Sequence, residues 1–171
     1  MATDRLQAPG HRRSRRPCRL WDTRTSEPTL IADRALGDGH IGALDYTTDG
    51  TRLLVGERAG ALYLIDAERL EPVTDPVRLA ERMRWAFVAS DQRTAFALTW
   101  DERFHVVNLE DARVLRSGEV GFHPTFAAFS PDGTRAAVAG LTGQVGVLDA
   151  ATDEWVRPPV IGHKNTVWMI N

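Results

Sequence analysis

The stretch AFSPDGTRAAVAGLTGQVGVLD, residues 128–149, occurs three times in this chain in related forms. The other copies are DYTTDGTRLLVGERAGALYLID at 45–66 and FVASDQRTAFALTWDERFHVVN at 87–108, so the spacing is 42 and then 41 residues. Each copy has an aspartate near its start and an aspartate or asparagine 17 residues later, at Asp49 and Asp66, Asp91 and Asn108, and Asp132 and Asp149. In two copies a glycine follows the first aspartate, as Gly50 and Gly133. A period just above 40 residues predicts an array of similar units rather than one compact enzyme domain.

Within each copy, short apolar or alternating segments separated by turn residues predict β-strands. We expect first strands near 41–46, 84–89 and 126–130, second strands near 52–56, 94–99 and 135–139, and third strands near 61–65, 103–107 and 144–148. Outer strands are expected near 72–79, 113–117 and 155–161. The third strands are almost continuously apolar, which is typical of a sheet covered on both faces. The sequence therefore predicts an all-β fold, a partial β-propeller with about three complete four-stranded antiparallel blades and partial blades at both ends. The blades are predicted at about 41–80, 83–121 and 123–161.

Histidines precede the first strands at His40, His123 and His163, and Arg82 takes this place in the middle copy. Residues 18–171 resemble the WD-repeat β-propeller family. The residues that carry the resemblance are Gly39-His40, Gly162-His163, the stretch at 129–133 and Leu20-Trp21-Asp22. The resemblance implies that these histidines and the six repeat carboxylates and amides are structural. The chain departs from the family at Ile65, Val107 and Leu148, which stand where the family has tryptophan. The family's buried histidine–aspartate network is therefore expected to be mostly absent.

The two ends of the repeat region each predict part of a further blade. Residues 18–21 have the character of a third strand, without the two strands that should come before it. Because the outer blades would then expose apolar faces, one expectation is self-association through these faces. The alternative is that strands at 18–21 and 29–32 join residues 165–170 in a defective fourth blade, which would hide both faces.

Composition restricts the classes of protein that fit. Residues 1–19 carry a net charge of +5 in a chain of net charge −2, which leaves −7 on the remainder. Residues 1–17 are predicted to form an Arg-rich disordered tail, and the acidic repeats argue against binding of nucleic acid. Since no apolar run approaches the roughly 18 residues of a membrane helix and no secretory signal is visible, we expect no membrane contact and a cytoplasmic location. Cys18 is the single cysteine, which excludes an internal disulfide.

No catalytic, cofactor or metal site is predicted. Three of the five histidines occupy repeat positions one blade apart, and Ser130 lies in a turn without the pattern that surrounds a nucleophilic serine. Gly140, Gly143 and Gly146 span a turn and a strand, not the start of a helix, so they do not predict a phosphate-binding loop.

Surface binding is the function that these observations favour. In the resembling family, partners dock on the rim formed by loops before the first strand and between the second and third strands. Carried over by position, the candidate partner-binding residues are Arg58, Arg84, Trp85, Trp100 and Leu141. Arginine and tryptophan often dominate binding energy, although Trp85 could equally pack between blades.

The favoured function is therefore a non-enzymatic scaffold for protein–protein interaction, with a protein partner and no cofactor. The resemblance extends to propeller tails of bacterial transcriptional and signalling regulators, and a ratio of 20 arginines to one lysine, Lys164, is typical of a high-GC bacterium. The alternatives are a propeller hydrolase of the lactonase or glycosidase type and a truncated gene product without independent function.

Overall fold

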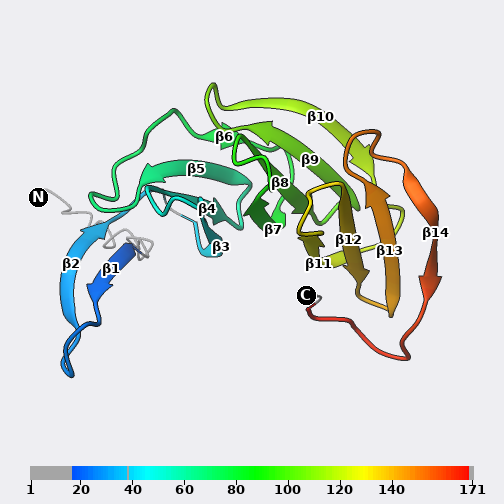
Figure 1. The fold of residues 1–171 in the computed structure, drawn as a ribbon, viewed down its shortest axis with the longest axis horizontal. Coiled ribbons are helices and arrows are strands. Elements are labelled where there is room, and N and C mark those ends of the chain that lie inside the picture. Colours follow the sequence, from blue (N-terminus) through cyan, green and yellow to red (C-terminus); the bar gives the residue numbers. More distant parts are fainter. Residues whose placement is uncertain (1–16, 38, 170–171) are drawn as a thin grey trace, which may run out of the picture.

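The computed structural model describes residues 17–37 and 39–169, and it is built from β-strands throughout (Figure 1). Three four-stranded antiparallel sheets and one two-stranded sheet follow one another along the chain. The hairpin contains β1 (Cys18–Asp22) and β2 (Thr29–Arg34). The first blade contains β3 (Ile41–Tyr46), β4 (Arg52–Glu57), β5 (Ala61–Asp66) and β6 (Val77–Arg78). The middle blade contains β7 (Met83–Val88), β8 (Thr94–Thr99), β9 (Arg103–Asn108) and β10 (Arg113–Glu119). The third blade contains β11 (Pro124–Phe129), β12 (Arg135–Gly140), β13 (Gln144–Asp149) and β14 (Trp155–Ile161).

The prediction of an all-β partial propeller is confirmed. In each blade the first three strands lie within two residues of their predicted limits. The outer strands predicted at 113–117 and 155–161 are confirmed by β10 and β14. The outer strand predicted at 72–79 is present but shorter, because only Val77 and Arg78 form a ladder with β5 there, apart from an isolated bridge at Pro72. Pro72 and Pro76 interrupt this segment. Proline has no amide hydrogen and cannot donate to a ladder, so regular pairing with β5 is interrupted between Pro72 and Pro76.

The blades stand side by side in an open arc (Figure 1). Strands β3, β7 and β11 line the concave side, and the outer strands lie on the convex side. β7 packs against β3 and β4, and β11 packs against β7 and β8. Two apolar clusters fill the spaces between blades: one joins Leu54 and Leu64 to Ala97 and Val107, and the other joins the middle and third blades.

The repeat carboxylates and amides fasten turns. Asp132 accepts hydrogen bonds from Ser130 Oγ at 2.6 Å and from the Thr134 amide at 3.0 Å, and Asp49 and Asp91 make similar contacts. These bonds stabilise the charged form and lower the pKa of Asp132 to about 2. Further along each copy, Asp66, Asn108 and Asp149 accept bonds from amides two and three residues later. Such local side-chain bonds are typical of turns, which agrees with the structural role that the resemblance implies for these positions.

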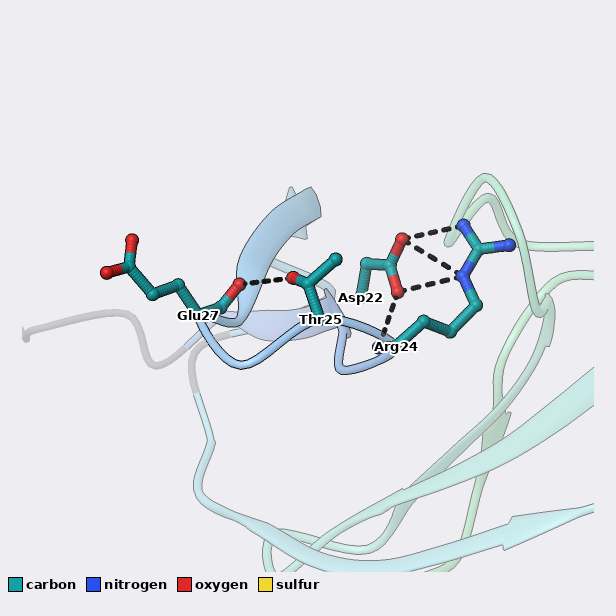
Figure 2. Close-up of polar contacts among 4 residues, drawn as sticks. All are labelled: Asp22, Arg24, Thr25 and Glu27. Carbon is teal, nitrogen blue, oxygen red and sulfur yellow. Dashed lines mark hydrogen bonds and ion pairs between the residues drawn. The ribbon is translucent and has the colours of Figure 1, made fainter.

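The amino-terminal hairpin covers part of the free face of the first blade. Cys18 is buried there with Val55, Tyr63 and Ile65. Its turn is fixed by Asp22, which accepts bonds from Arg24 Nη2 at 2.6 Å and Arg24 Nε at 3.0 Å, while Thr25 Oγ1 donates to the Glu27 carbonyl at 2.8 Å (Figure 2). The Arg24 side chain lowers the pKa of Asp22.

The alternative closure into a fourth blade is not what the described residues form. β1 pairs with β2 alone, and residues 162–169 contain no strand. The hairpin lies at one end of the arc, whereas residues 162–169 follow the third blade at the other end and turn back to the concave side (Figure 1). Residues 1–16, which include nearly all of the predicted Arg-rich tail, lie outside the described part of the chain.

Candidate partner-binding rim

One backbone hydrogen bond recurs in all three blades and brings the predicted rim residues to one edge. The residue after the second strand donates its amide to the carbonyl of the residue ahead of the first strand. These bonds are Arg58 to His40 at 2.8 Å, Trp100 to Arg82 at 3.0 Å and Leu141 to His123 at 3.0 Å. Because β3, β7 and β11 line the concave side, the three pairs form one edge of the arc's inner surface.

A β-bulge at the start of each first strand directs a side chain at this edge. The register shifts between Ile41 and Ala43, between Met83 and Trp85, and between Pro124 and Phe126, so the residues at the bulges are Gly42, Arg84 and Thr125. A bulge adds an unpaired residue and reorients its side chain. In the first blade no side chain stands there, and the Arg58 side chain fills the space: a Cβ on Gly42 would lie 2.9 Å from Arg58 Cγ.

Arginine and tryptophan side chains gather at this edge in what we call the Arg–Trp cluster, which consists of Arg58, Arg82, Arg84, Trp100 and Trp168. The Arg84 guanidinium lies 4.7 Å from the centre of the Trp100 ring and 5.9 Å from that of Trp168. Arg82 also lies over Trp100, at 5.9 Å. Guanidinium groups at such distances are attracted by the negative face of an indole ring. Trp100 is 41% exposed and Trp168 is 69% exposed, so both rings are accessible from solvent.

The arginines of this cluster lack anionic partners within the described part of the chain. None of the three forms an ion pair or a side-chain hydrogen bond with a described carboxylate. The nearby carboxylate of Glu57 is instead buried and accepts the Gly39 amide at 3.3 Å. Partial burial lowers the pKa of Arg84, and the positive charge of Arg58 lowers it further. The cluster therefore gathers three arginines that form no ion pair with a described carboxylate.

The predicted rim residues do not all lie together. Arg58, Arg84 and Trp100 meet in the cluster, whereas Leu141 holds the equivalent position in the third blade, where its carbonyl accepts a bond from Thr166 Oγ1 at 2.6 Å. Trp85 is half-buried against Phe126 of the third blade, with ring centres 5.1 Å apart. Of the two interpretations left open for Trp85, the structure shows blade packing.

Sequence reasoning missed Arg82 and Trp168. In the repeat, Arg82 replaces a histidine, which does not by itself indicate a binding residue. Trp168 lies in the segment that resembles the start of a further copy. Trp168 reaches the cluster because its segment is fastened to the third blade: Thr125 Oγ1 donates to the Val167 carbonyl, and the Val167 amide donates to the Gly140 carbonyl at 3.3 Å. The place of Arg82 in the repeat, ahead of a first strand, is the signal that could have found it, whereas no signal of this kind marks Trp168.

The repeat histidines contribute to the blades mainly through the backbone. The carbonyls of His40 and His123 accept the recurring bond, and Arg82 performs the same task, so the bond does not need an imidazole. The exposed His123 ring contacts Glu102, with Nδ1 at 3.3 Å from Oε1. The side chains of His40 and His163 are exposed.

His105 makes the most developed histidine contacts, although it stands outside the rim. Its Nδ1 lies 2.7 Å from Ser117 Oγ, and its Nε2 lies 3.3 Å from Thr99 Oγ1. Partial burial lowers the pKa of His105, which favours the neutral imidazole. The contact joins β9 to the outer strand β10, so this serine–histidine pair lies toward the convex side, away from the Arg–Trp cluster.

The described residues contain no group of three or more metal-ligating side chains. They also contain no helix that is long and apolar enough to span a membrane.

Comparison with known proteins supports the fold. No protein-family model and no curated protein sequence matches this chain. Among 1359 matching chains of solved structures is one of Kuenenia stuttgartiensis hydrazine synthase, with a TM-score of 0.70 and 20% sequence identity. The match covers 82% of this chain and 42% of that chain, so this chain spans less than half of that relative's length. At this identity the likeness shows a shared fold and nothing of activity.

Proposed function

We propose that this chain is a non-enzymatic protein-interaction scaffold of the WD-repeat type and that it binds its partner through the Arg–Trp cluster. The observation that carries the proposal is the Arg84 guanidinium over the Trp100 ring, 4.7 Å from its centre, beside two further arginines that form no ion pair with a described carboxylate. Arginine and tryptophan supply large contact area and multiple donors, and they are enriched among residues that dominate binding. The WD-repeat assignment is supported by the repeat spacing and by the turn-fastening aspartates.

The geometry also favours a partner large enough to span blades. The cluster draws its side chains from the first blade, the middle blade and the segment beyond the third blade. Such a surface does not need to form a pocket, because a protein partner would cover it from the opposite side. The partner is proposed to be a protein, and the regulatory role in a larger bacterial signalling or transcriptional protein is part of the same proposal.

Cross-linked capture from bacterial extract with the whole chain tests this function. The variant Arg58→Ala with Trp100→Ala should weaken capture of a protein partner by about 2 kcal/mol or more, the scale at which anchor residues act. Arg69→Ala with Trp21→Ala is the matched control, because both side chains are exposed and lie outside the cluster. Unfolding curves of both variants establish that the blades persist. Equal capture by the two variants would contradict the proposal.

The contact between Ser117 and His105 favours a hydrolase as the second candidate function. That function predicts turnover of a lactone or glycoside panel by the whole chain and its loss in Ser117→Ala and His105→Gln. If turnover persists in both variants, Ser117 and His105 are not its catalytic residues. If the chain shows no turnover, the hydrolase function is rejected and the scaffold function is kept.

A further inference from the structure

We infer that the Arg–Trp cluster recognises carboxylate groups, so that the partner of this chain presents an acidic segment to it. The inference rests on the proposed function and adds the chemistry of the partner. It starts from the three arginines of the cluster, which carry charge at the inner edge without carboxylates of their own.

A contact with an indole ring leaves an arginine able to bind a carboxylate. A guanidinium that lies over an indole ring uses its flat face for the contact, while its N–H groups point outward in its own plane and stay available. The guanidinium carbon of Arg84 lies 4.7 Å from the centre of the Trp100 ring and 5.9 Å from that of Trp168, distances at which this arrangement fits. The fixed fork of N–H donors matches the two oxygens of a carboxylate, and such paired, charge-assisted bonds are among the strongest in proteins.

The positively charged neighbours of Arg84 make binding of an anion more favourable. Arg58 lies close enough to act on Arg84 electrostatically, and Arg82 shares the Trp100 ring with it. Bringing like charges together is unfavourable, and an anion placed among them removes this cost. A segment with several carboxylates would satisfy more than one arginine at once.

The same residues argue against nucleic acid as the occupant. Single-stranded nucleic acid is bound by aromatic rings whose faces are free to stack on bases. Here the ring that lies deepest in the cluster, Trp100, already has Arg82 and Arg84 over it, and Arg84 also lies near the more exposed Trp168. Residues 20–171 carry a net charge of −7, since the whole chain carries −2 and residues 1–19 carry +5. A long polyanion would be repelled by the remainder of the chain, whereas a short acidic segment needs only the cluster.

The experiment measures binding of a ten-residue glutamate peptide with a neutral fluorescent label to the whole 171-residue chain. A ten-residue glutamine peptide and a ten-nucleotide thymidine strand are the comparison probes. We expect the glutamate peptide to bind and the glutamine peptide not to bind. Arg84→Ala should lower the affinity by about tenfold or more, and Arg84→Lys should lower it as well, because lysine lacks the planar fork. Arg78→Ala, on the outer strand β6, should leave the affinity unchanged.

Several outcomes would overturn the inference: equal binding of the glutamate and glutamine peptides, unchanged affinity in folded Arg84→Ala, or tighter binding of the thymidine strand. Absence of binding by all three probes would overturn it too. Arg58→Ala provides a second variant if Arg84→Ala proves unfolded, since the Arg58 side chain is exposed. The two proposals can be told apart. If partner capture depends on Trp100 but the glutamate peptide does not bind, the scaffold function is supported and the acidic partner is rejected.

Discussion

Gly133 shows how a single residue in this chain serves both a turn and a blade contact. Its φ of 71° lies in the left-handed region that favours glycine, and Gly50 has the same conformation in the first blade with a φ of 70°. The surroundings differ. A Cβ on Gly133 would lie 2.7 Å from Ser90 Cβ in the middle blade, whereas a Cβ on Gly50 would meet nothing within 4 Å.

This difference predicts unequal effects of the same substitution. Gly50→Ala should lower the free energy of unfolding by about 1 kcal/mol through backbone strain alone. Gly133→Ala should lower it further, because the new methyl group also collides with Ser90. Denaturant unfolding of both variants measures the two losses. In the Ser90→Gly background the extra loss at Gly133 should disappear, and equal losses in the original background would show that the two blades do not touch at this turn.

At the scale of strands and blades, the strands of each sheet could be predicted, except for the extent of the outer strand in the first blade. The turns at Asp49, Asp91 and Asp132 mark where the first strand ends and the second begins, so the first three strands follow from local signals. Only the outer strand of the first blade is much shorter than predicted. Pro72 and Pro76 were visible in the sequence, and their missing amide hydrogens explain why β6 is limited to Val77–Arg78.

The rim could be predicted in part for a related reason. The repeat placed Arg58, Trp100 and Leu141 at equivalent positions after the second strands, and the structure brings these positions to one edge. The contacts among side chains depend on non-local geometry. The bulge that holds Arg84 lies between β7 and β8 of the middle blade, and the turn of the chain brings Trp168 back to Arg84 from beyond the third blade. No local pattern encodes the meeting of the two side chains.

The shortened β6 predicts uneven protection of the outer edge. The amides of Thr74 and Asp75 lie between the two prolines and outside any strand. They should exchange with solvent faster than the amides of segment 115–118 in β10. Peptide-level hydrogen–deuterium exchange compares the two segments, with segment 62–65 of the buried strand β5 as the protected reference. Equal protection of the two outer segments would mean that the first blade has a full outer strand.

The whole molecule is an arc with incompletely covered ends. Leu44 and Tyr46 on β3 are 52% and 50% exposed, whereas Ala86 and Val88, which occupy the same positions in the middle blade, are 1% and 8% exposed. The difference arises because the first blade covers β7, while the hairpin leaves β3 open. At the other end, Val160 and Ile161 of β14 are also exposed. Exposed apolar surface of this kind favours association.

The open arc is the central structural claim, and light scattering of the whole chain over a range of concentrations tests it most directly. We propose that the chain associates through its end faces. The measured mass should then exceed the 19.0 kDa of one chain and rise with concentration. Leu44→Glu with Tyr46→Glu should lower it, while Leu115→Glu on the outer strand β10 should not. A monodisperse 19.0 kDa species that binds no hydrophobic dye would contradict the open arc and show that both ends are covered within a single chain.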